Sequence, residues 1–399
     1  PSSYMPYMNH PLFGNALNRN GGLFVNPYAE MVRGYQEFNT STIMPQIQIN
    51  QNLNALIPGL SLTAMTYLKR YAYFEVNRKY NPFYYTASAD AYGDLSLRVM
   101  NDGSLGSIGT VGTEYLDYSE SAKEVNSMFY AHAIASYNHA FGKHNVGATV
   151  IGLVQNSLSG NAGNLQLSLP SRNIGLSGRF SYNFDDRYIA EFNFGYNGSE
   201  RFAKNRRLGF FPSFGLSYNI SNEAFFEPVK EVISKLKIRA THGFAGNDQI
   251  GRSEDRFFYL SDVDMNAFPV GFGELSGYNR PTIAIRRYAN QDITWERSRQ
   301  TNLGLELGLF KDLELNVDVY KQVRSNILTG RSYIPSTMGL RAPIVANTNK
   351  AESKGVDLTL NYNKNFGDSW YIQGRGTMTY AVSKKLIVDE PAYKEASRY

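Results

Sequence analysis

Residues 313–320, LELNVDVY, alternate apolar and polar side chains with a period of two. Leu313, Leu315, Val317 and Val319 fall on one set of positions, and polar residues occupy the positions between them. This period is typical of a β-strand that has one apolar face and one polar face. The stretch therefore predicts a strand that separates an apolar environment from a wet one.

The same alternation recurs along the chain in segments of about ten residues, the length that a tilted strand needs to cross a bilayer. Runs beginning near Ile174, Leu236 and Val356 repeat the pattern clearly. We predict about twelve strands, near residues 42–53, 60–70, 127–140, 145–155, 172–183, 188–198, 209–220, 236–246, 299–309, 313–324, 355–363 and 370–381.

The connections between these strands are sorted by length. Short connections are predicted at 55–59, 141–144, 184–187, 310–312 and 364–369, and long ones at 71–127, 156–171, 199–208, 247–298 and 325–354. Alternating tight turns and long loops are the expected topology of an outer-membrane barrel. The predicted fold class is therefore all-β, a transmembrane antiparallel up-and-down β-barrel in the bacterial cell outer membrane.

The connection 221–235 breaks the rule of alternating lengths. Ser221 or Asn222 is a suitable N-cap, and Pro228 to Leu236 could form one or two helical turns, so we predict a helical turn there. Aromatic residues gather beside several short turns, which is typical of the aromatic girdle of a membrane barrel. They are Tyr137, Phe141, Tyr182, Phe184, Tyr188, Tyr362, Phe366 and Trp370.

Composition excludes several classes of mechanism. The chain has 399 residues, 29 Tyr, 24 Phe and 35 Gly, but no Cys, so disulfides, thiolate metal sites and cysteine nucleophiles are excluded. The formal charge of +5 is small and its basic residues are scattered, which does not favour nucleic acid as a partner. No apolar run is long enough for a membrane-spanning helix, and no signal peptide is visible at Pro1, so we expect a mature fragment.

Four stretches together resemble the SusC/RagA family of TonB-dependent transporters of Bacteroidota. The first is 186–202, DRYIAEFNFGYNGSERF. The others agree with the family in order and spacing, and they are 209–213 continuing to 220–225, then 236–239 with Gly243 and 246–247, then Trp295 and Glu296 with Asn302, Gly304 and Glu306. Tyr218 stands where the family usually has Trp.

The resemblance implies that residues 1–399 are part of the barrel domain of a TonB-dependent receptor, within a barrel of about 22 strands. The family's plug, TonB-interacting segment and added N-terminal domain, and its closing C-terminal strands, are expected outside this chain. The implied function is TonB-dependent active import of a large nutrient, an oligosaccharide or a peptide. Implied partners are a SusD-like surface lipoprotein that acts as a lid, TonB, and outer-membrane lipid. A dimer of transporter–lid pairs is left open.

Sequence motifs for catalysis or metal binding are not found. The five histidines, His10, His132, His139, His144 and His242, are dispersed, and no nucleophile elbow or phosphate-binding loop occurs. A segment beginning at Asp262 starts like a calcium loop, but Ala267 and Gly273 stand where Gly and a bidentate Glu are needed. We therefore expect no enzyme activity, no catalytic residues, no cofactor and no metal.

The predicted long loops are rich in aromatic residues. Aromatic faces stack on sugar rings and also pack against peptide side chains or a partner protein, although they can equally pack among themselves to order the loops. The candidate residues for contact with substrate or lid are Tyr84, Tyr85, Tyr92, Tyr259, Phe268, Phe272 and Tyr278.

Three alternatives remain from the sequence. One is a passive or structural outer-membrane barrel, a porin of about twelve strands that is complete in itself. Another is an outer-membrane enzyme such as a lipase or protease, which would need a nucleophile and a base facing one another. The last is a soluble all-β adhesin, which would not partition into detergent.

Overall fold

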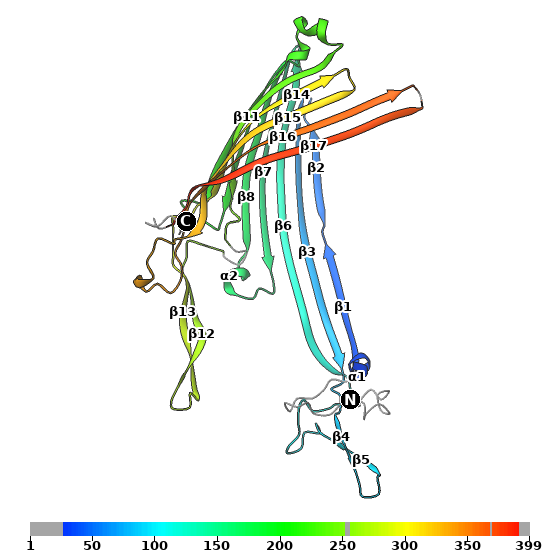
Figure 1. The fold of residues 1–399 in the computed structure, drawn as a ribbon, viewed down its shortest axis with the longest axis vertical. Helices are drawn as coiled ribbons and strands as arrows, with labels where there is room; N and C mark the ends of the chain where they lie inside the picture. The colour runs from blue at the N-terminus through cyan, green and yellow to red at the C-terminus, as the bar shows by residue number, and fades with distance from the viewer. Residues whose placement is uncertain (1–26, 252–255, 368, 391–399) are drawn as a thin grey trace. The chain divides into compact units, whose positions relative to one another are not determined.

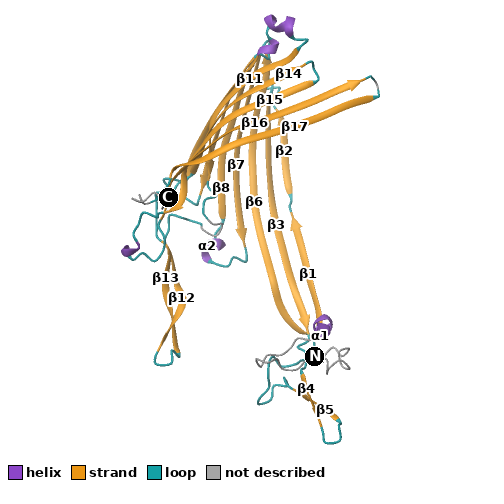
Figure 2. Ribbon diagram, viewed as in Figure 1, coloured by secondary structure: helices purple, strands orange, loops and turns teal. Residues whose placement is uncertain are grey.

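The computed structural model describes residues 27–251, 256–367 and 369–390, and almost all of its regular structure is antiparallel β-sheet (Figures 1 and 2). In this described part, no helix is long and apolar enough to cross a membrane. Two compact units are distinguished. Of the described residues, unit 1 comprises 27–44, 69–127 and 159–161, and unit 2 comprises 45–68, 128–158, 162–251, 256–367 and 369–390.

Unit 1 is built around a β-ribbon and a hairpin. β1 (Gly34–Ile43) pairs antiparallel with the second half of β3 (Leu60–Lys79), and the short helix α1 (Pro27–Val32) precedes it. β4 (Tyr85–Ala89) and β5 (Leu95–Val99) form a separate two-stranded hairpin. The first part of β6 also lies in unit 1.

Unit 2 contains the main sheet, in which each strand pairs antiparallel with its neighbours. Its strand order is β2-β3-β6-β7-β8-β9-β10-β11-β14-β15-β16-β17. The strands are β2 (Gln46–Asn52), the first part of β3, the second part of β6 (Asp117–Phe141), β7 (His144–Ser159), β8 (Ser171–Phe184), β9 (Tyr188–Ser199), β10 (Leu208–Asn219), β11 (Ile233–Asn247), β14 (Glu296–Leu309), β15 (Leu313–Gly330), β16 (Val345–Phe366) and β17 (Trp370–Ile387). Such a meander of neighbouring strands confirms the predicted all-β class.

The pairing register gives the unit 2 sheet two distinct faces, because directly paired residues point to the same side. We call one the apolar face. One row across it runs through Ala190, Leu216, Ala240, Leu303, Val319, Val356 and Tyr380. The polar face carries the intervening positions, and a row across it runs through Ser217, Arg239, Gly304, Asp318, Asp357 and Thr379. The predicted alternation thus extends coherently from strand to strand.

Short turns close one end of these strands, which we call the short-turn end. Asp185 and Asp186 between β8 and β9, and Phe310 and Lys311 between β14 and β15, all have positive φ angles of 52° to 64°. Two successive residues with positive φ form a turn whose twist matches that of the two strands in a tight hairpin. Gly142 takes the same conformation in the turn between β6 and β7.

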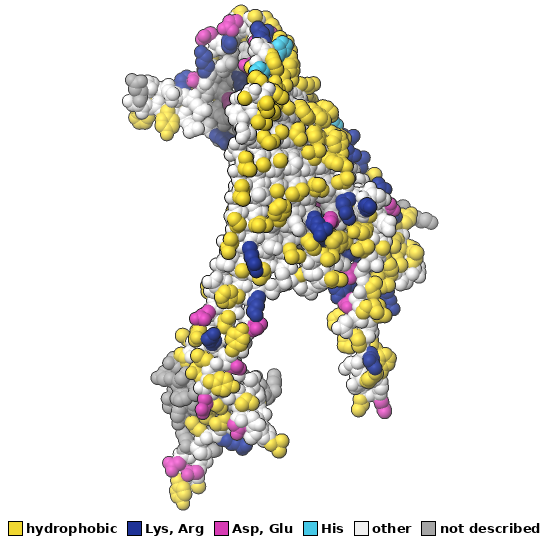
Figure 3. All heavy atoms as spheres, turned by 180° about the vertical axis from the view of Figure 1, so that it is seen from behind, with side chains coloured by type: hydrophobic (Ala, Val, Ile, Leu, Met, Phe, Trp, Pro, Cys, Tyr) yellow, Lys and Arg dark blue, Asp and Glu magenta, His cyan; other side chains and the backbone are white. Residues whose placement is uncertain are grey.

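Aromatic side chains collect on the apolar face at the short-turn end, as the sequence predicted. Tyr188 stacks on Tyr218 with ring centroids 4.9 Å apart, and Phe184 stacks on Tyr188 at 6.4 Å. His139 packs against Phe141 at 4.4 Å. Seen from behind, the sheet carries a broad region of hydrophobic side chains (Figure 3).

The connection between β10 and β11 is helical, but not where the sequence placed the helix. Two 3-10 helices occur, η2 (Ile220–Asn222) and η3 (Ala224–Val229), and neither begins with a side-chain cap. The predicted helix from Pro228 to Leu236 is therefore wrong, because β11 already begins at Ile233 and pairs with β14.

Several predicted loops are partly strand. β3, β6, β11, β14, β15 and β16 all continue beyond the predicted bounds, and 247–298 contains the hairpin β12 (Asp262–Phe272) and β13 (Tyr278–Arg287). Backbone pairing continues there without an apolar face, so hydrophobic alternation no longer marks it. The single strand predicted at 42–53 is two, β1 and β2, separated at Met44 and Pro45. The other helices are α2 (Leu165–Ser168) and η4 (Ser336–Met338).

Candidate functional site

Linked ion pairs and hydrogen bonds cover the polar face of unit 2. On β8 and β9, Arg179 Nη2 lies 2.6 Å from Glu191 Oε2, and Asn193 Nδ2 donates to Glu191 Oε1 at 2.7 Å. The paired strands bring these residues together from positions twelve residues apart in the chain. The polar face is thus lined by fixed donors and acceptors rather than by isolated charges.

Glu306 on β14 is the centre of the largest of these networks. Its carboxylate lies 2.9 Å from Lys235 Nζ, 3.8 Å from Lys237 Nζ and 3.7 Å from Arg239 Nε. Its side chain is only 16% exposed, whereas the cations around it are more accessible. Arg239 also reaches Asp318 Oδ2 at 2.5 Å on the far side of β14. One partly buried carboxylate therefore holds three cations from β11 together.

Gly304 explains how Arg239 crosses the intervening strand. Gly304 lies between Arg239 and Asp318 in the register. A Cβ atom at Gly304 would be 2.4 Å from Arg239 Nε and 2.8 Å from Asp318 Oδ1, so a larger residue would displace the pair. Asn302 Nδ2 donates to the same Asp318 at 3.0 Å. Asn302, Gly304 and Glu306, which belong to the stretches that resemble the family, thus lie together on the polar face.

A shallow cavity of about 480 Å³ opens on the middle of the polar face. It is bordered by strands β9, β10, β11 and β14. Its lining includes Glu191, Asn193, Ser213, Arg239, Thr241 and Gln300. A wall of this kind can exchange hydrogen bonds with a hydrated, polar solute.

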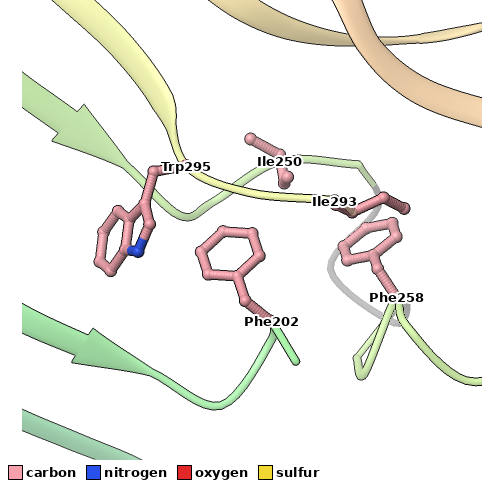
Figure 4. Close-up of a cluster of buried hydrophobic side chains, with 5 residues drawn as sticks. All are labelled: Phe202, Ile250, Phe258, Ile293 and Trp295. Atoms are coloured by element: carbon pink, nitrogen blue, oxygen red, sulfur yellow. The ribbon is translucent and has the colours of Figure 1, made fainter. Parts of the chain in front are cut away.

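A buried hydrophobic cluster lies at the opposite end of the strands from the short turns, which we call the long-loop end. It consists of Phe202, Ile250, Phe258, Ile293 and Trp295 (Figure 4). Phe202 is fully buried, and its ring lies 5.3 Å from that of Trp295. The five residues come from three connections: Phe202 lies between β9 and β10, Ile250 and Phe258 lie between β11 and β12, and Ile293 and Trp295 lie between β13 and β14. We call this group the loop-base cluster, and it fixes the bases of those connections together.

Arg256 braces two of the long connections. Its guanidinium donates to the carbonyl oxygens of Gln166, Leu169 and Pro170 at 3.0, 2.5 and 2.7 Å. Burial lowers the pKa of Arg256. Beside it, Arg287 packs over the ring of Phe258 at 5.6 Å and is itself buried. Residues 166–170 are therefore held to the segment that enters the β12–β13 hairpin.

Three of the predicted contact residues lie on the β12–β13 hairpin, which Figure 1 shows extending away from the sheet. Phe272 and Tyr278 are direct register partners near its tip. Phe268 is 91% exposed, and Arg280 lies 4.7 Å over the Tyr278 ring. The hairpin thus presents aromatic surface to solvent beyond the loop-base cluster.

The other predicted contact residues are not brought together with these. Tyr259 is half-buried beside the loop-base cluster, with its ring 6.3 Å from Phe257. Tyr84, Tyr85 and Tyr92 lie in unit 1, where burial raises the pKa of Tyr84 and Tyr85 while Tyr92 is 93% exposed. Of the four, Tyr92 is the one with an open ring surface.

Sequence reasoning missed the polar residues that order the loops. Asn101 is fully buried, accepts from Tyr84 N at 2.8 Å, and donates to Pro82 O and Thr110 O. Asn347 similarly donates to Thr294 O and Asn326 O, at 3.0 and 2.8 Å. Their partners are backbone atoms of distant segments, so no side-chain motif could have indicated them.

The calcium-like segment is used for strand pairing. Asp264 accepts from Asn266 N at 2.9 Å and from Arg286 Nη2 at 2.5 Å across the hairpin. In the ranges that the structure describes, no three His, Asp or Glu side chains are grouped so that they could hold a metal ion.

Comparison with known proteins agrees with this architecture. A family model described as TonB dependent receptor-like, beta-barrel matches residues 1–397. TonB-dependent receptor P3 of Formosa agariphila is 30% identical over 189 residues, which are 47% of this chain and 18% of that protein. TonB-dependent receptor SusC of Bacteroides thetaiotaomicron is also 30% identical over 189 residues, 46% of this chain and 18% of that protein.

Two solved structures share the fold at lower identity. The RagAB peptide transporter superposes with a TM-score of 0.62 at 20% identity, over 93% of this chain and 40% of that chain. The RagAB peptide importer in the closed-closed state gives a TM-score of 0.61 with the same identity and coverage. The chain thus spans less than half the length of each of these four relatives.

Proposed function

The chain belongs to the TonB-dependent receptor-like β-barrel family of outer-membrane proteins, and from this premise we propose that it forms part of the barrel wall of an energy-coupled importer. The cargo is a large nutrient, an oligosaccharide or a peptide, that crosses the bacterial outer membrane through the barrel. The family is one of receptors, so we assign no catalytic role to any residue.

One observation supports this proposal most directly, namely the two-sided sheet of unit 2. Its apolar face suits contact with lipid, and its polar face carries ordered ion pairs around Glu306 and Glu191. In a barrel of this kind, the polar side lines the lumen. A hydrated solute moving along that wall would meet hydrogen-bonding groups throughout.

The exposed aromatic residues of the long-loop end are the proposed sites of first contact with substrate or lid. Phe268, Phe272 and Tyr278 share one hairpin, and its base is fixed by the loop-base cluster. Rigidly based aromatic rings bind sugar rings or apolar peptide side chains at low entropic cost. Tyr92 is a further exposed ring, on unit 1.

The proposed partners follow from the family. A SusD-like surface lipoprotein would cover the barrel from outside, and TonB would act through segments outside this chain. A plug is needed because a wide barrel would otherwise be open to water.

Uptake by cells tests the coupled-import proposal. A strain lacking the gene would be complemented with the full-length protein and supplied with a fluorescent oligosaccharide or peptide. We expect uptake that a protonophore, or deletion of TonB, abolishes. Uptake that persists without either source of coupling would contradict the proposal and favour a passive barrel.

Single-channel recording is an independent test that distinguishes a passive porin from a plugged importer. The purified full-length protein would be reconstituted into a planar bilayer. A plugged importer should show no steady open conductance until the plug is removed with denaturant, whereas a porin conducts at once.

Substitution of the hairpin aromatics tests their assignment. The variant F268A/F272A/Y278A should weaken binding of the transported substrate, with about 1–3 kcal/mol lost for a well-stacked ring. F225A is the matched control, because Phe225 is 70% exposed but lies at the short-turn end. Equal binding by both variants would remove these rings from the substrate site.

A further inference from the structure

A cluster of lysines interrupts the apolar face of unit 2 near the long-loop end. Lys321 on β15 and Lys354 on β16 are direct register partners, and Lys384 on β17 pairs with Glu352. The three lysines and Glu352 occupy the same set of alternating positions as Val319, which lies on the apolar face. They therefore point to the outside of the sheet and not toward the polar face.

A single buried carboxylate holds the three lysines. Glu352 lies 2.9 Å from Lys321 Nζ, 3.1 Å from Lys354 Nζ and 3.8 Å from Lys384 Nζ. The Glu352 side chain is 8% exposed, whereas those of the lysines are 50%, 56% and 63% exposed. Three positive charges and one negative charge leave an excess of two positive charges, and the buried carboxylate is screened from any ligand outside.

Two arginines extend this basic surface onto β14. Arg299 is exposed and lies in the same register row as Val323 and Glu352. Arg297, two positions further, packs over the ring of Phe244 at 4.2 Å. Directly opposed like charges destabilise a sheet, and Glu352 compensates Lys321 and Lys354 only in part, because the cluster keeps an excess of two positive charges. A basic patch maintained across four neighbouring strands therefore points to an anionic ligand.

The height of this patch matches the edge of a membrane. Lys321 and Lys354 lie side by side, but the short turns from which their heights are measured differ. At ~3.4 Å per residue, Lys321 is about 27 Å of strand from the start of β15 at Leu313. Lys354 is about 40 Å of strand from the end of β16 at Phe366. With a tilt of about 40°, these lengths correspond to heights of roughly 20 to 30 Å. The apolar band of such barrels is about 25 Å tall, so the ammonium groups reach the headgroup level.

We propose that this outward basic patch binds the phosphate groups of the phosphorylated glycolipid in the outer leaflet of the outer membrane. Lysine binds phosphate as a compact point charge, and lysines near a membrane surface attract anionic lipid. The cargo is not the ligand here, because the patch and the polar face lie on opposite sides of the sheet. The inference rests on the membrane placement of the apolar face and not on which nutrient is imported.

Binding of defined lipids to the full-length protein in detergent tests the inference. The probes are lipid A with its phosphates and the same lipid A after enzymatic dephosphorylation, and native mass spectrometry measures the bound fraction. At about 5-fold per lysine, K321Q/K354Q/K384Q should lose affinity for phosphorylated lipid A on the order of 100-fold. The variant K321R/K354R/K384R should retain it.

The matched control is K143Q/K311Q/K364Q, which removes three lysines near the short turns. It should bind phosphorylated lipid A as the wild type does. Equal binding of the two lipids by the wild type, or equal loss in the two glutamine variants, would overturn the inference. Folding of each variant is checked by heat-dependent mobility on a gel. If the triple variant does not fold, K384Q alone should lose about 5-fold, and no loss would also overturn it.

Discussion

Glu306 is the residue on which the ion-pair network of the polar face depends most. Replacing it with glutamine, E306Q, would leave Lys235, Lys237 and Arg239 close together without their shared carboxylate. Because the site is partly buried, we expect a loss of about 1–3 kcal/mol in the free energy of unfolding. Urea unfolding of the full-length protein in lipid vesicles measures it.

The control for this variant is an ion pair in open solvent. Glu227 and Lys230 lie 3.3 Å apart, with side chains 72% and 43% exposed, so E227Q should change stability by less than about 0.5 kcal/mol. If E306Q were as mild as E227Q, the network would line the face without stabilising it.

At the residue scale, the sequence predicted the polar face better than it predicted the loops. Asn302, Gly304 and Glu306 could be found because they lie at a fixed spacing within one strand that resembles the family's pattern. Arg256 and Asn101 could not, because each binds backbone atoms that are brought close only by the tertiary fold. Exposure was equally unpredictable: Tyr84 is half-buried and Tyr92, eight residues later, is almost fully exposed.

The tight turns store conformational strain that a single substitution can relieve. Lys311 has φ +64° in the turn between β14 and β15. An L-residue pays about 1–2 kcal/mol for this conformation, whereas glycine adopts it freely. We expect K311G to be about 1 kcal/mol more stable to urea than K311A. Both variants lack the lysine side chain, and they differ in the free-energy cost of a positive φ at residue 311. A reversed order would contradict the turn geometry.

The β12–β13 hairpin should respond to acid through Asp264. The hydrogen bond from Asn266 N, and then that from Arg286, hold the pKa of Asp264 below its ordinary value of 3.8. A carboxyl with a lowered pKa stabilises the folded form above the unfolded pKa, and this contribution is lost as pH falls through the lowered value. Hairpin protection should therefore be constant above about pH 5 and decline below about pH 4.

Hydrogen exchange followed by mass spectrometry, corrected for intrinsic rates, measures this protection. The variant D264N cannot form the ion pair with Arg286, so it should be less protected than the wild type above about pH 5. The two should converge in acid. A difference that stayed constant down to pH 2 would show that the carboxylate does not hold the hairpin.

At the scale of elements, strand existence was predictable and strand length was not. The alternation around 313–320 located β15 correctly because that part of the strand separates apolar from polar surroundings. Beyond Val319 the same strand continues to Gly330, through Lys321 on the apolar side. Hydrogen-bonded pairing needs no hydrophobic pattern, so alternation does not predict the extensions or the two hairpins as strands.

At the scale of the whole molecule, sidedness is the property that joins fold to function. The rows of paired residues keep apolar side chains on one face from β9 to β17. A soluble protein would have to cover that face with other elements, whereas a membrane barrel leaves it to lipid. The same register keeps the networks of Glu191 and Glu306 on the other face. In the proposed importer, alternation alone would thus separate the lipid-facing side chains from those that face the solute.

Two arginine substitutions on one strand test this sidedness directly. Leu303 and Gln300 both lie on β14, Leu303 on the apolar face at 58% exposure and Gln300 on the polar face at the cavity. In lipid vesicles, L303R should cost about 2–4 kcal/mol of unfolding free energy, because a charge would face hydrocarbon, and Q300R about 0–1 kcal/mol. The measurement is urea unfolding of the full-length protein, followed by heat-dependent mobility on a gel. Both sites are solvent-accessible in the structure, so burial alone does not predict such a difference. Equal costs, or folding of the protein in water without detergent or lipid, would contradict the assignment of the apolar face to the membrane.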